Sequence, residues 1–579
     1  MPTRSFSFGD FLARGGSPEA AAALMLAELR KVPAECRKEV LFTAGQEYHF
    51  FAERAQAFRW HISNHEQGVA RRCAILLESL RNVTLRGNGA QLLMHGCLVP
   101  LAIVNCQDVV VEDLVIDYPT PTVQQLEILE ADEGRDEMLC EVGGETPFRI
   151  EDSRLVFQAE GRELRPYWCM AFEPNRHLIC QCADQRLYEP SRPALQLEGP
   201  RRVRFIHPNR LFRPGQRLVL RDAHRPAPGC FAYKSNNIVF KGMSIHFSDG
   251  MGFLVQRCAE IALERCACAP SPAQPWRYFS CLADATHFVA CRGTIRVEDS
   301  RFEQMGDDAI NVHGVYLSNI VQEDAHTLLA SYCHPESWGF RWGEPGDRLR
   351  LVNRNTLEDL PGEWTLQGIA PVDSPTEDGA KTWRITTAEP LPRLDDTRGW
   401  GLENVTWTPS VRFRRNLIRN NRARGALFTT RGAVRCEENC FDHVHGCAIL
   451  VCGDCREWFE SGACGKVTIT RNDFLDNLTA DYEFCHAVIS VAPHLAADEA
   501  RPQSPVHGVI EVTGNRFVTA NAPLLYVRSA KRVVFRDNAV VPSDAAPPCA
   551  PAPPPVTLRD VTEASILQQD EAEEALYRE

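Results

Sequence analysis

The sequence predicts an all-β chain in which a parallel β-helix carries two inserted β-domains. Three observations lead to this prediction. Short β-rich phrases of one form recur along most of the 579 residues, and several of them recur at an interval of 23 residues. Two other intervals between the phrases are much too long for one coil of such a helix. Repeats of this size, rich in Val and Ile and punctuated by Asn and Gly, are typical of a parallel β-helix with stacked coils, or rungs.

The recurring phrase has an apolar residue, two further residues, an Asn or a small or apolar residue, one residue and another apolar residue. Met243 and Cys266 hold the fourth position in two such phrases and lie 23 residues apart. Because stacked Asn side chains form hydrogen-bonded ladders, an Asn at this position is interpreted as structural. It occurs in "FRRNLI", "CEENCF", "ITRNDF", "VTGNRF" and "FRDNAV", at Asn416, Asn439, Asn472, Asn515 and Asn538.

The two long intervals run from Leu114 to Met243 and from Ser300 to Asn416. Each contains alternating, strand-like sequence and a turn phrase, "FRPGQRLVLRD" or "GEPGDRLRLV", which predicts a small inserted β-domain. Residues 17–31 resemble a short helix, whereas "PSDAAPPCAPAPPPV" cannot hold regular structure. The predicted organisation is an N-terminal helical segment (1–34), the first β-helix rungs (35–118), inserted β-domain 1 (119–228), the β-helix rungs of the candidate site (229–314), inserted β-domain 2 (315–409), the final β-helix rungs (410–542) and a Pro/Ala-rich and acidic tail (543–579).

Charge and cysteine content narrow the possible partners and the expected compartment. The net charge of −13 and the pI near 5.8 argue against a nucleic-acid partner, because phosphate binding needs a basic excess. The 23 cysteines are scattered, and the single C-x-x-C at Cys452 and Cys455 lacks the second pair of a zinc ribbon, so reduced, packed thiols are expected. No signal peptide or membrane span is visible, which predicts a cytoplasmic protein, or a secreted or periplasmic one if an export signal has been trimmed.

The stretch "EQMGDDAINVHG" contains the strongest candidate for chemistry, the adjacent Asp307 and Asp308. Two like charges this close raise one pKa, which suits acid–base catalysis on a sugar, although a Gly-Asp-Asp sequence is often only a solvated turn. Asp284 precedes Asp307 by 23 residues and is expected one rung away, about 4.8 Å distant. Counting from Asn416 places Arg424 one rung beyond Asp308, where it would form an ion pair or bind a hydroxyl. A structural turn rarely collects three carboxylates.

Four phrases, "DATHFVACRG", "MGDDAINVHG", "NNRARGALFTT" and "WFESG", resemble in order the motifs of glycoside hydrolase family 110, the inverting α-1,3-galactosidases. The resemblance extends from about residue 35 to 540. It implies a right-handed parallel β-helix with two inserted β-barrel domains. It also implies removal of terminal α-1,3-linked galactose from blood-group B type or linear α-galactosyl glycans, without a metal or cofactor. At the matching positions, Asp307 corresponds to the general acid, and Asp284 and Asp308 to the pair that holds and activates water.

An inverting enzyme needs one protonated carboxyl and one carboxylate, usually about 6.5–9.5 Å apart. Asp307 is expected to stay protonated because Asp284 and Asp308 are anionic neighbours. Asn311 and His313 are suited to hydroxyl contacts, and His287 either joins them or has a structural role. Trp458 offers an apolar face to a galactose ring, or is part of the core, and Glu460 can accept hydrogen bonds from hydroxyl groups.

Two other functions fit the same scaffold. A pectin-type glycosidase or lyase would need several exposed basic residues for an acidic polymer, and only Arg424 is well placed for this. A non-catalytic glycan-binding β-helix would need no carboxylate cluster. The expected partners are therefore galactose-terminated glycans, with no nucleic acid and no membrane, and a homodimer is compatible with the sequence.

Overall fold

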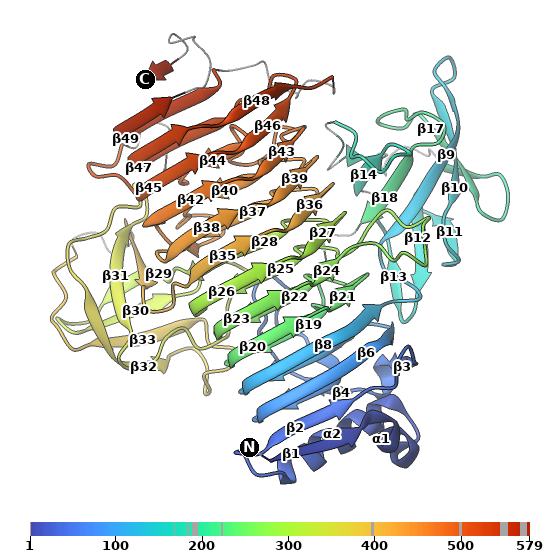
Figure 1. The fold of residues 1–579 in the computed structure, drawn as a ribbon, viewed down its shortest axis with the longest axis horizontal. Coiled ribbons are helices and arrows are strands. Elements are labelled where there is room, and N and C mark those ends of the chain that lie inside the picture. Colours follow the sequence, from blue (N-terminus) through green and yellow to red (C-terminus); the bar gives the residue numbers. More distant parts are fainter. Residues whose placement is uncertain are drawn as a thin grey trace.

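The fold is a stack of parallel β-rungs with two antiparallel insertions, as predicted (Figure 1). The computed structural model describes residues 2–166, 168–180, 182, 185–187, 195–221, 224–394, 399–496, 501–544, 554–567 and 576–578. The stack begins at the N-terminal end and finishes at the C-terminal end, and the insertions project from opposite sides of it. In the described part of the chain, no helix has the length and apolar character needed to cross a membrane.

Three faces of parallel strands make up the β-helix. The first face contains β1 (Thr3–Ser7), β2 (Arg37–Leu41), β6 (Arg81–His95), β8 (Gln107–Asp117), β20 (Asn236–Lys241), β23 (Ala259–Glu264), β26 (Arg292–Glu298), β35 (Ser410–Arg414), β38 (Ala433–Glu437), β42 (Lys466–Thr470), β45 (His507–Thr513) and β47 (Leu525–Arg536). The second contains β3 (Glu47–Phe51), the ends of β6 and β8, and β21 (Ser244–Ile245), β24 (Ala267–Cys268), β27 (Arg301–Glu303), β36 (Leu417–Arg419), β39 (Cys440–Asp442), β43 (Asp473–Leu475), β46 (Arg516–Thr519) and β48 (Ala539–Pro542). The third contains β5 (Arg71–Glu78), β7 (Val99–Val104), β19 (Cys230–Tyr233), β22 (Phe253–Gln256), β25 (Thr286–Val289), β28 (Ile310–Val315), β37 (Ala426–Thr429), β40 (Ile449–Val451), β44 (Ile489–Val491), the start of β47 and β49 (Val556–Leu567).

The repeat intervals correspond to pairing registers. Ser244 pairs with Ala267 and Leu417 with Cys440, each 23 residues apart as predicted. Aromatic side chains stack along the interior: the ring centroids of Phe441 and Phe474 lie 5.3 Å apart, and those of Phe474 and Phe517 lie 4.8 Å apart. Each rung therefore packs its apolar residues on those of the rungs before and after it.

The predicted asparagine ladder is present at one corner of the helix. Each member accepts hydrogen bonds from the previous one: the Asn416 backbone N–H and its Nδ2 donate to Asn439 Oδ1 at 2.9 and 3.0 Å. The same contacts join Asn439 to Asn472, Asn472 to Asn515 and Asn515 to Asn538. All five side chains are buried. The ladder therefore satisfies backbone donors at a turn that water cannot reach.

The two insertions are antiparallel β-sheets. The first contains β9 (Gln124–Asp132), β10 (Glu137–Val142), β11 (Phe148–Glu151), β12 (Arg154–Ala159), β13 (Arg162–Leu164), β14 (Trp168–Phe172), β15 (Gln185–Arg186), β16 (Leu195–Leu197), β17 (Arg202–Ile206) and β18 (Arg217–Arg221). The second contains β29 (Ser318–Gln322), β30 (Thr327–Ser331), β31 (Arg348–Asn353), β32 (Trp364–Pro371), β33 (Thr382–Thr387) and β34 (Trp400–Asn404). A bridge between Leu317 and Leu402 joins the two ends of the second insertion.

Both ends of the chain contain more structure than the sequence predicts. The expected helix is α2 (Pro18–Lys31), but α1 (Phe8–Gly15) and β1 precede it. The sequence also predicts that the rungs stop at residue 542. Instead, β49 pairs with β47 and buries Val556 and Leu558, so the apolar alternation after the proline-rich stretch extends the stack.

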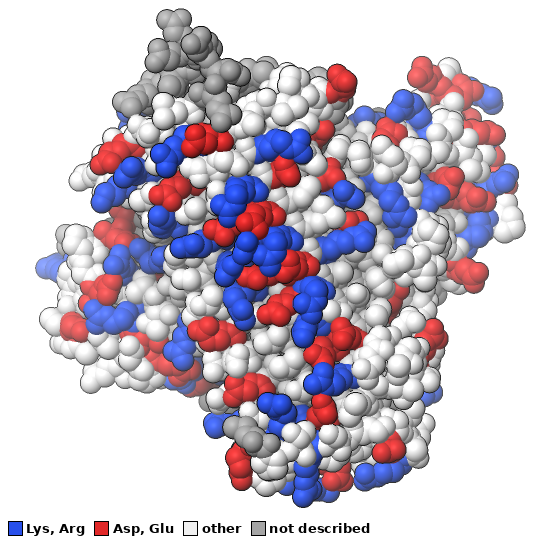
Figure 2. Space-filling view, viewed as in Figure 1, with Lys and Arg blue, Asp and Glu red and all other residues white. Residues whose placement is uncertain are grey.

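Charged side chains of both signs alternate over the face shown in Figure 2. Charged side chains of neighbouring rungs also form ion pairs, for example Arg414 with Glu438 at 2.8 Å and Arg415 with Asp299 at 2.6 Å. On this face, positive charge is interleaved with negative charge and forms no continuous basic stripe.

Replacing the central ladder residue, Asn439→Ala, is expected to destabilise the protein by about 3 kcal/mol. The change leaves buried donors of Asn416 and the Phe413 carbonyl without partners, and each lost partner costs ~1–3 kcal/mol. Chemical denaturation should measure the change. Asn355→Ala is a matched control because its side-chain oxygen accepts a hydrogen bond from Arg456 at the surface, and a loss there as large as that for Asn439 would contradict the special role of the ladder.

Candidate active site

The candidate site lies on the third face, where the turns before three consecutive strands meet. Thr286 in β25 pairs with Ile310 in β28, and Ile310 pairs with Ala426 in β37. This register puts Asp308 level with Arg424, as predicted. It also corrects one prediction: β25 and β28 are offset by 24 residues rather than 23, so Asp284 lies level with Asp308 and not with Asp307. The strand hydrogen bonds fix this register, whereas the length of each rung varies with its turns.

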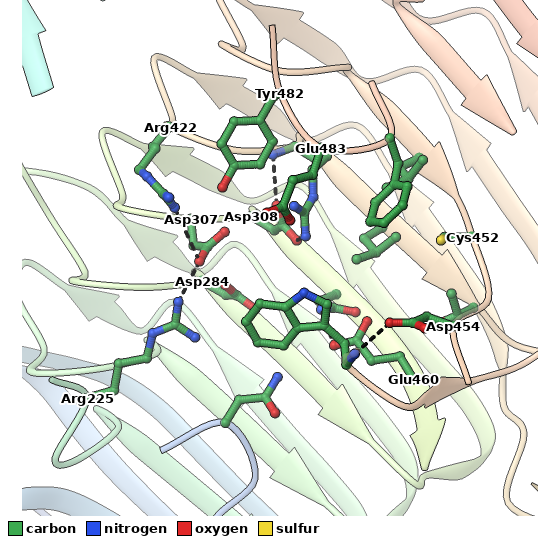
Figure 3. Close-up of a pocket in the computed structure, with 18 residues that line it drawn as sticks. Arg225, Asp284, Asp307, Asp308, Arg422, Cys452, Asp454, Glu460, Tyr482 and Glu483 are labelled. Carbon is green, nitrogen blue, oxygen red and sulfur yellow. Dashed lines mark hydrogen bonds and ion pairs between the residues drawn. The ribbon is translucent and has the colours of Figure 1, made fainter. Parts of the chain in front are cut away.

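Three buried carboxyls form the centre of the site (Figure 3). Asp284, Asp307 and Asp308 are only 3, 8 and 1% exposed, and one oxygen of each lies within 4.8 Å of the others. They line a pocket of about 160 Å³, which is far more than the ~10–15 Å³ that one water occupies. The wall of the pocket is completed by Asn64, Arg225, Asn311, Arg422, Arg424, Leu427, Thr429, Leu450, Cys452, Asp454, Trp458, Glu460, Tyr482, Glu483 and Phe484.

Arginines hold two of the three carboxyls. Arg225 Nη2 donates to Asp307 Oδ2 at 2.7 Å, and Arg422 Nη1 lies 3.6 Å from the same oxygen. Asp308 accepts from the Arg424 backbone N–H at 2.8 Å and from its Nη2 at 3.0 Å. Asp307 and Asp308 are therefore anchored from two directions, and Figure 3 shows Arg225 and Arg422 approaching Asp307 from opposite sides.

The charge states differ from those expected from the sequence. Burial alone would raise the pKa of Asp307, but the positive charges of Arg225, Arg422 and Arg424 outweigh it and lower this pKa. The prediction that Asp307 stays protonated is therefore wrong, because Arg225 and Arg422 lower its pKa. The opposite holds for the other two carboxyls.

Burial raises the pKa of Asp284 well above its usual value, and the charge on Asp307 adds to the rise. Burial also raises the pKa of Asp308, where the nearby Arg424 opposes the effect and the two other carboxyls reinforce it. These shifts favour a proton on Asp284 or Asp308 over a proton on Asp307.

The remaining pocket residues offer polar and aromatic contacts. Asn311 Nδ2 donates to Glu460 Oε1 at 3.4 Å, whereas Asn311 Oδ1 has no hydrogen-bond partner among the described residues. Trp458 stacks on His334 of the second insertion, with ring centroids 4.8 Å apart. Asp454 accepts a backbone hydrogen bond from Trp458 at 2.6 Å and so fixes the loop that carries the indole.

The predicted site residues divide into two groups. Asp284, Asp307, Asp308, Asn311, Arg424, Trp458 and Glu460 all line the pocket. His313, which the sequence suits to hydroxyl contacts, is 1% exposed and lies outside the pocket lining. His287, for which the sequence allows either the same contacts or a structural role, is 0% exposed and also lies outside the lining. His287 Nδ1 is 2.7 Å from Asp284 Oδ2, so its contact is with the carboxyl rather than with the pocket.

Some residues of the site carry no signal in the rung pattern. Arg225 follows the first insertion, and Asn64 lies in a loop before β5, so neither can be placed by counting 23 residues. Tyr482 belongs to a long turn between β43 and β44. Arg422, in contrast, can be located from the sequence, because it lies two residues before Arg424 in "NNRARG".

The carboxyl cluster also has the spacing of a cation site. Among the described residues, Asp284, Asp307 and Asp308 form the group whose carboxylate oxygens could converge on an ion. Arg225 and Arg424, however, already occupy an oxygen of Asp307 and both oxygens of Asp308. Since calcium takes six or more oxygen ligands, this donor set fits proton sharing better than calcium binding.

Grouped carboxyls of different pKa in a polar pocket on a β-helix define a glycoside hydrolase site. Alpha-1,3-galactosidase B of Phocaeicola vulgatus is 36% identical over 548 residues, covering 92% of this chain and 91% of that relative. Alpha-1,3-galactosidase B of Parabacteroides distasonis is 36% identical over 527 residues, covering 90% and 85%. The chain therefore belongs to the α-1,3-galactosidases of glycoside hydrolase family 110.

No family model matches the chain. Among solved structures, an exopolygalacturonase from Thermotoga maritima aligns with 97% of this chain and 89% of its own at 12% identity, with a TM-score of only 0.35.

Arg225→Gln is expected to raise the pKa of Asp307, because it removes the nearest positive charge. The limb of the pH–rate profile that Asp307 controls should therefore move to higher pH. This shift is measured from kcat/KM against pH. Arg213→Gln, an exposed arginine paired with Glu173, is the control. Identical profiles for Arg225→Gln and the unmodified protein would mean that Arg225 does not set the protonation of Asp307.

Proposed function

We propose that the chain is an exo-acting glycoside hydrolase that removes terminal α-1,3-linked galactose from glycans, with inversion at the anomeric carbon. One observation carries the proposal: Asp284, Asp307 and Asp308 converge at the base of one pocket in a member of the α-1,3-galactosidase family. Their different pKa values provide both a proton donor and a proton acceptor.

In this mechanism, Asp307 gives a proton to the glycosidic oxygen, and Asp284 and Asp308 hold and deprotonate the attacking water. Asp307 must first take up a proton against the influence of Arg225. The raised pKa values of its two neighbours place protons close enough to supply it. As an acid, Asp307 limits the rate at high pH, so the descending limb of the pH–rate profile should lie on the acidic side and respond to Arg225→Gln.

The stereochemical outcome needs its own argument. The nearest carboxyl oxygens lie within 4.8 Å, which is shorter than the ~6.5–9.5 Å usual between a single acid and a single base in inverting enzymes. We propose that a water bound jointly by Asp284 and Asp308 attacks from the face opposite the leaving group. The inverting mechanism of the family that the motifs resemble supports this arrangement.

Sugar recognition is assigned to the remaining pocket residues. The buried, unpartnered Asn311 Oδ1 can accept a hydrogen bond from a galactose hydroxyl, which would remove the cost of leaving it unsatisfied. Trp458 offers an apolar ring surface, and Glu460 can accept from further hydroxyls. A neutral hexose suits this wall because the three arginines of the pocket are already paired with Asp307 and Asp308.

An acidic polymer is a less suitable substrate. Arg225, Arg422 and Arg424 give the pocket more positive charge than the sequence predicts, yet each faces Asp307 or Asp308. A uronic acid carboxylate would have to displace these carboxyls or remain beside them. Simple glycan binding, in turn, would not need three carboxyls buried at such cost.

In a panel of α-1,3-, α-1,4- and α-1,6-linked galactosides, the α-1,3-linked substrate should be hydrolysed at least 100-fold faster than the other two.

Asp307→Asn should reduce the activity on the α-1,3-linked substrate by 10³-fold or more without unfolding, because it removes the acid from a solvent-facing pocket. Asp537→Asn, exposed on a late rung, is the control. An active Asp307→Asn protein, with a tenth or more of the original rate, would exclude this residue from the chemistry.

NMR of the first product formed should show β-galactose released from the α-linked substrate. The anomers must be observed before mutarotation mixes them. Early α-galactose would demonstrate retention, and the joint water-binding role of Asp284 and Asp308 would then be untenable.

A further inference from the structure

His287 and His313 form a chain of short contacts behind the pocket that the proposed reaction does not yet use. His313 Nδ1 lies 2.6 Å from the Gly314 carbonyl oxygen, and His313 Nε2 lies 2.9 Å from His287 Nε2. His287 Nδ1 then lies 2.7 Å from Asp284 Oδ2. Both rings are buried and meet edge to face, with centroids 4.9 Å apart.

The chemistry of each partner fixes the hydrogen positions along this chain. A carbonyl oxygen only accepts, so His313 Nδ1 must carry a hydrogen. In neutral His313, Nε2 is then an acceptor, and His287 must donate from its own Nε2. Neutral His287 has no hydrogen left for Nδ1, so Asp284 Oδ2 must carry the hydrogen of the last contact. The alternative to this neutral pair is an ionised Asp284 beside a positively charged His287 that carries the hydrogen on Nδ1.

In both arrangements, one proton lies between Asp284 Oδ2 and His287 Nδ1. We propose, on the basis of the function above, that His287 and His313 are positioning residues that form a proton relay for Asp284. His313 fixes the tautomer of His287, and His287 accepts the Oδ2 proton when Asp284 acts on water. The second oxygen of Asp284 is thereby available to the pocket as a base.

The surroundings of the two histidines allow a proton to pass to His287 but do not favour a lasting positive charge on either ring. Burial lowers the pKa values of His287 and His313 to about 4, so neither ring holds a charge stably near neutral pH. Glu460 Oε1, 3.5 Å from His313 Nε2, partly offsets this effect. The charged and titratable groups that interact with Asp284 and the two rings are Asp307, Asp308, Glu460, Arg225, Arg424, His65 and His334.

The proton balance of the step is complete without another reactant. The bond from the anomeric carbon to the glycosidic oxygen breaks as Asp307 protonates that oxygen, and the water oxygen bonds to the anomeric carbon. Asp284 takes the water's proton on its pocket-facing oxygen, while its Oδ2 proton moves to His287 Nδ1. The catalytic group thus gains one proton and loses one, and the charge on His287 is balanced by the newly ionised Asp307.

The relay is tested with variants that differ in which proton transfers they allow. His287→Gln can hydrogen-bond Asp284 but cannot take up its proton, so kcat should fall about 100-fold with little change in KM. The ascending limb of its pH profile should move to higher pH, because Asp284 must then release its proton to water. His507→Gln, another buried histidine on a strand, is the control and should retain full activity if folded.

Two variants of His313 distinguish a proton relay from a role in packing alone. His313→Gln keeps an acceptor for His287 and a donor for Gly314, and should stay within about threefold of the original rate. His313→Leu removes both, and should lose tenfold or more with the same shift in pH profile. Equal activities and pH profiles for these two folded variants, or an unchanged profile for His287→Gln, would overturn the relay.

The tautomers of the two histidines can be measured in the protein without substrate, which tests the relay independently of activity. In ¹⁵N-histidine NMR, with signals assigned by their loss in the variants, His313 should be the Nδ1–H tautomer. His287 should carry a hydrogen on Nε2. A neutral His287 protonated only on Nδ1 would reject the relay whatever the kinetics. An unmodified protein without galactosidase activity would reject the proposed function, whereas an active one with a fully active His287→Gln variant would reject only the relay.

Discussion

In-register stacking of parallel rungs is the constraint on which every other feature of this protein depends. Neighbouring strands lie about 4.8 Å apart, so residues at equivalent positions on successive rungs are forced together whatever their chemistry. The same rule places Phe474 on Phe441, Asn472 on Asn439 and Arg424 beside Asp308. Where the stacked residues are apolar the result is a core, and where they are amides it is a ladder. Where they are carboxyls the result is a site with strongly perturbed protonation.

The carboxyl cluster is tolerated because other elements of the chain surround it with compensating groups. Arg225 reaches Asp307 from the segment that returns from the first insertion, and Arg424 reaches Asp308 from the following rung. Asp284 has a histidine partner instead of a cation. The three side chains thus have different surroundings despite their proximity, and this asymmetry separates their pKa values. Identical surroundings would leave the protons shared and the roles of donor and acceptor undefined.

Much of this arrangement could be predicted from the sequence, because it repeats. The ladder from Asn416 to Asn538 and the level of Arg424 follow from counting residues between phrases. Counting fails where rung length changes, as for Asp284, since a turn can gain a residue without disturbing the strands beside it. It also cannot find Arg225 or Asn64, which enter the site from outside the repeat. What covers a histidine is equally hidden: His287 and His313 are on rungs of the right register, yet both are buried and neither lines the pocket.

The contact between Trp458 and His334 joins two parts of the fold that differ in how freely their sequence can change. The carboxyls belong to rungs that can hardly change without disturbing their neighbours. Trp458, which lines the pocket, packs on the second insertion. This insertion leaves the stack after β28 and returns before β35, and it can therefore accept substitutions or changes in length at little cost to the rungs. In related proteins, the specificity for the group attached to the galactose can therefore change through such loops, while the catalytic carboxyls stay the same.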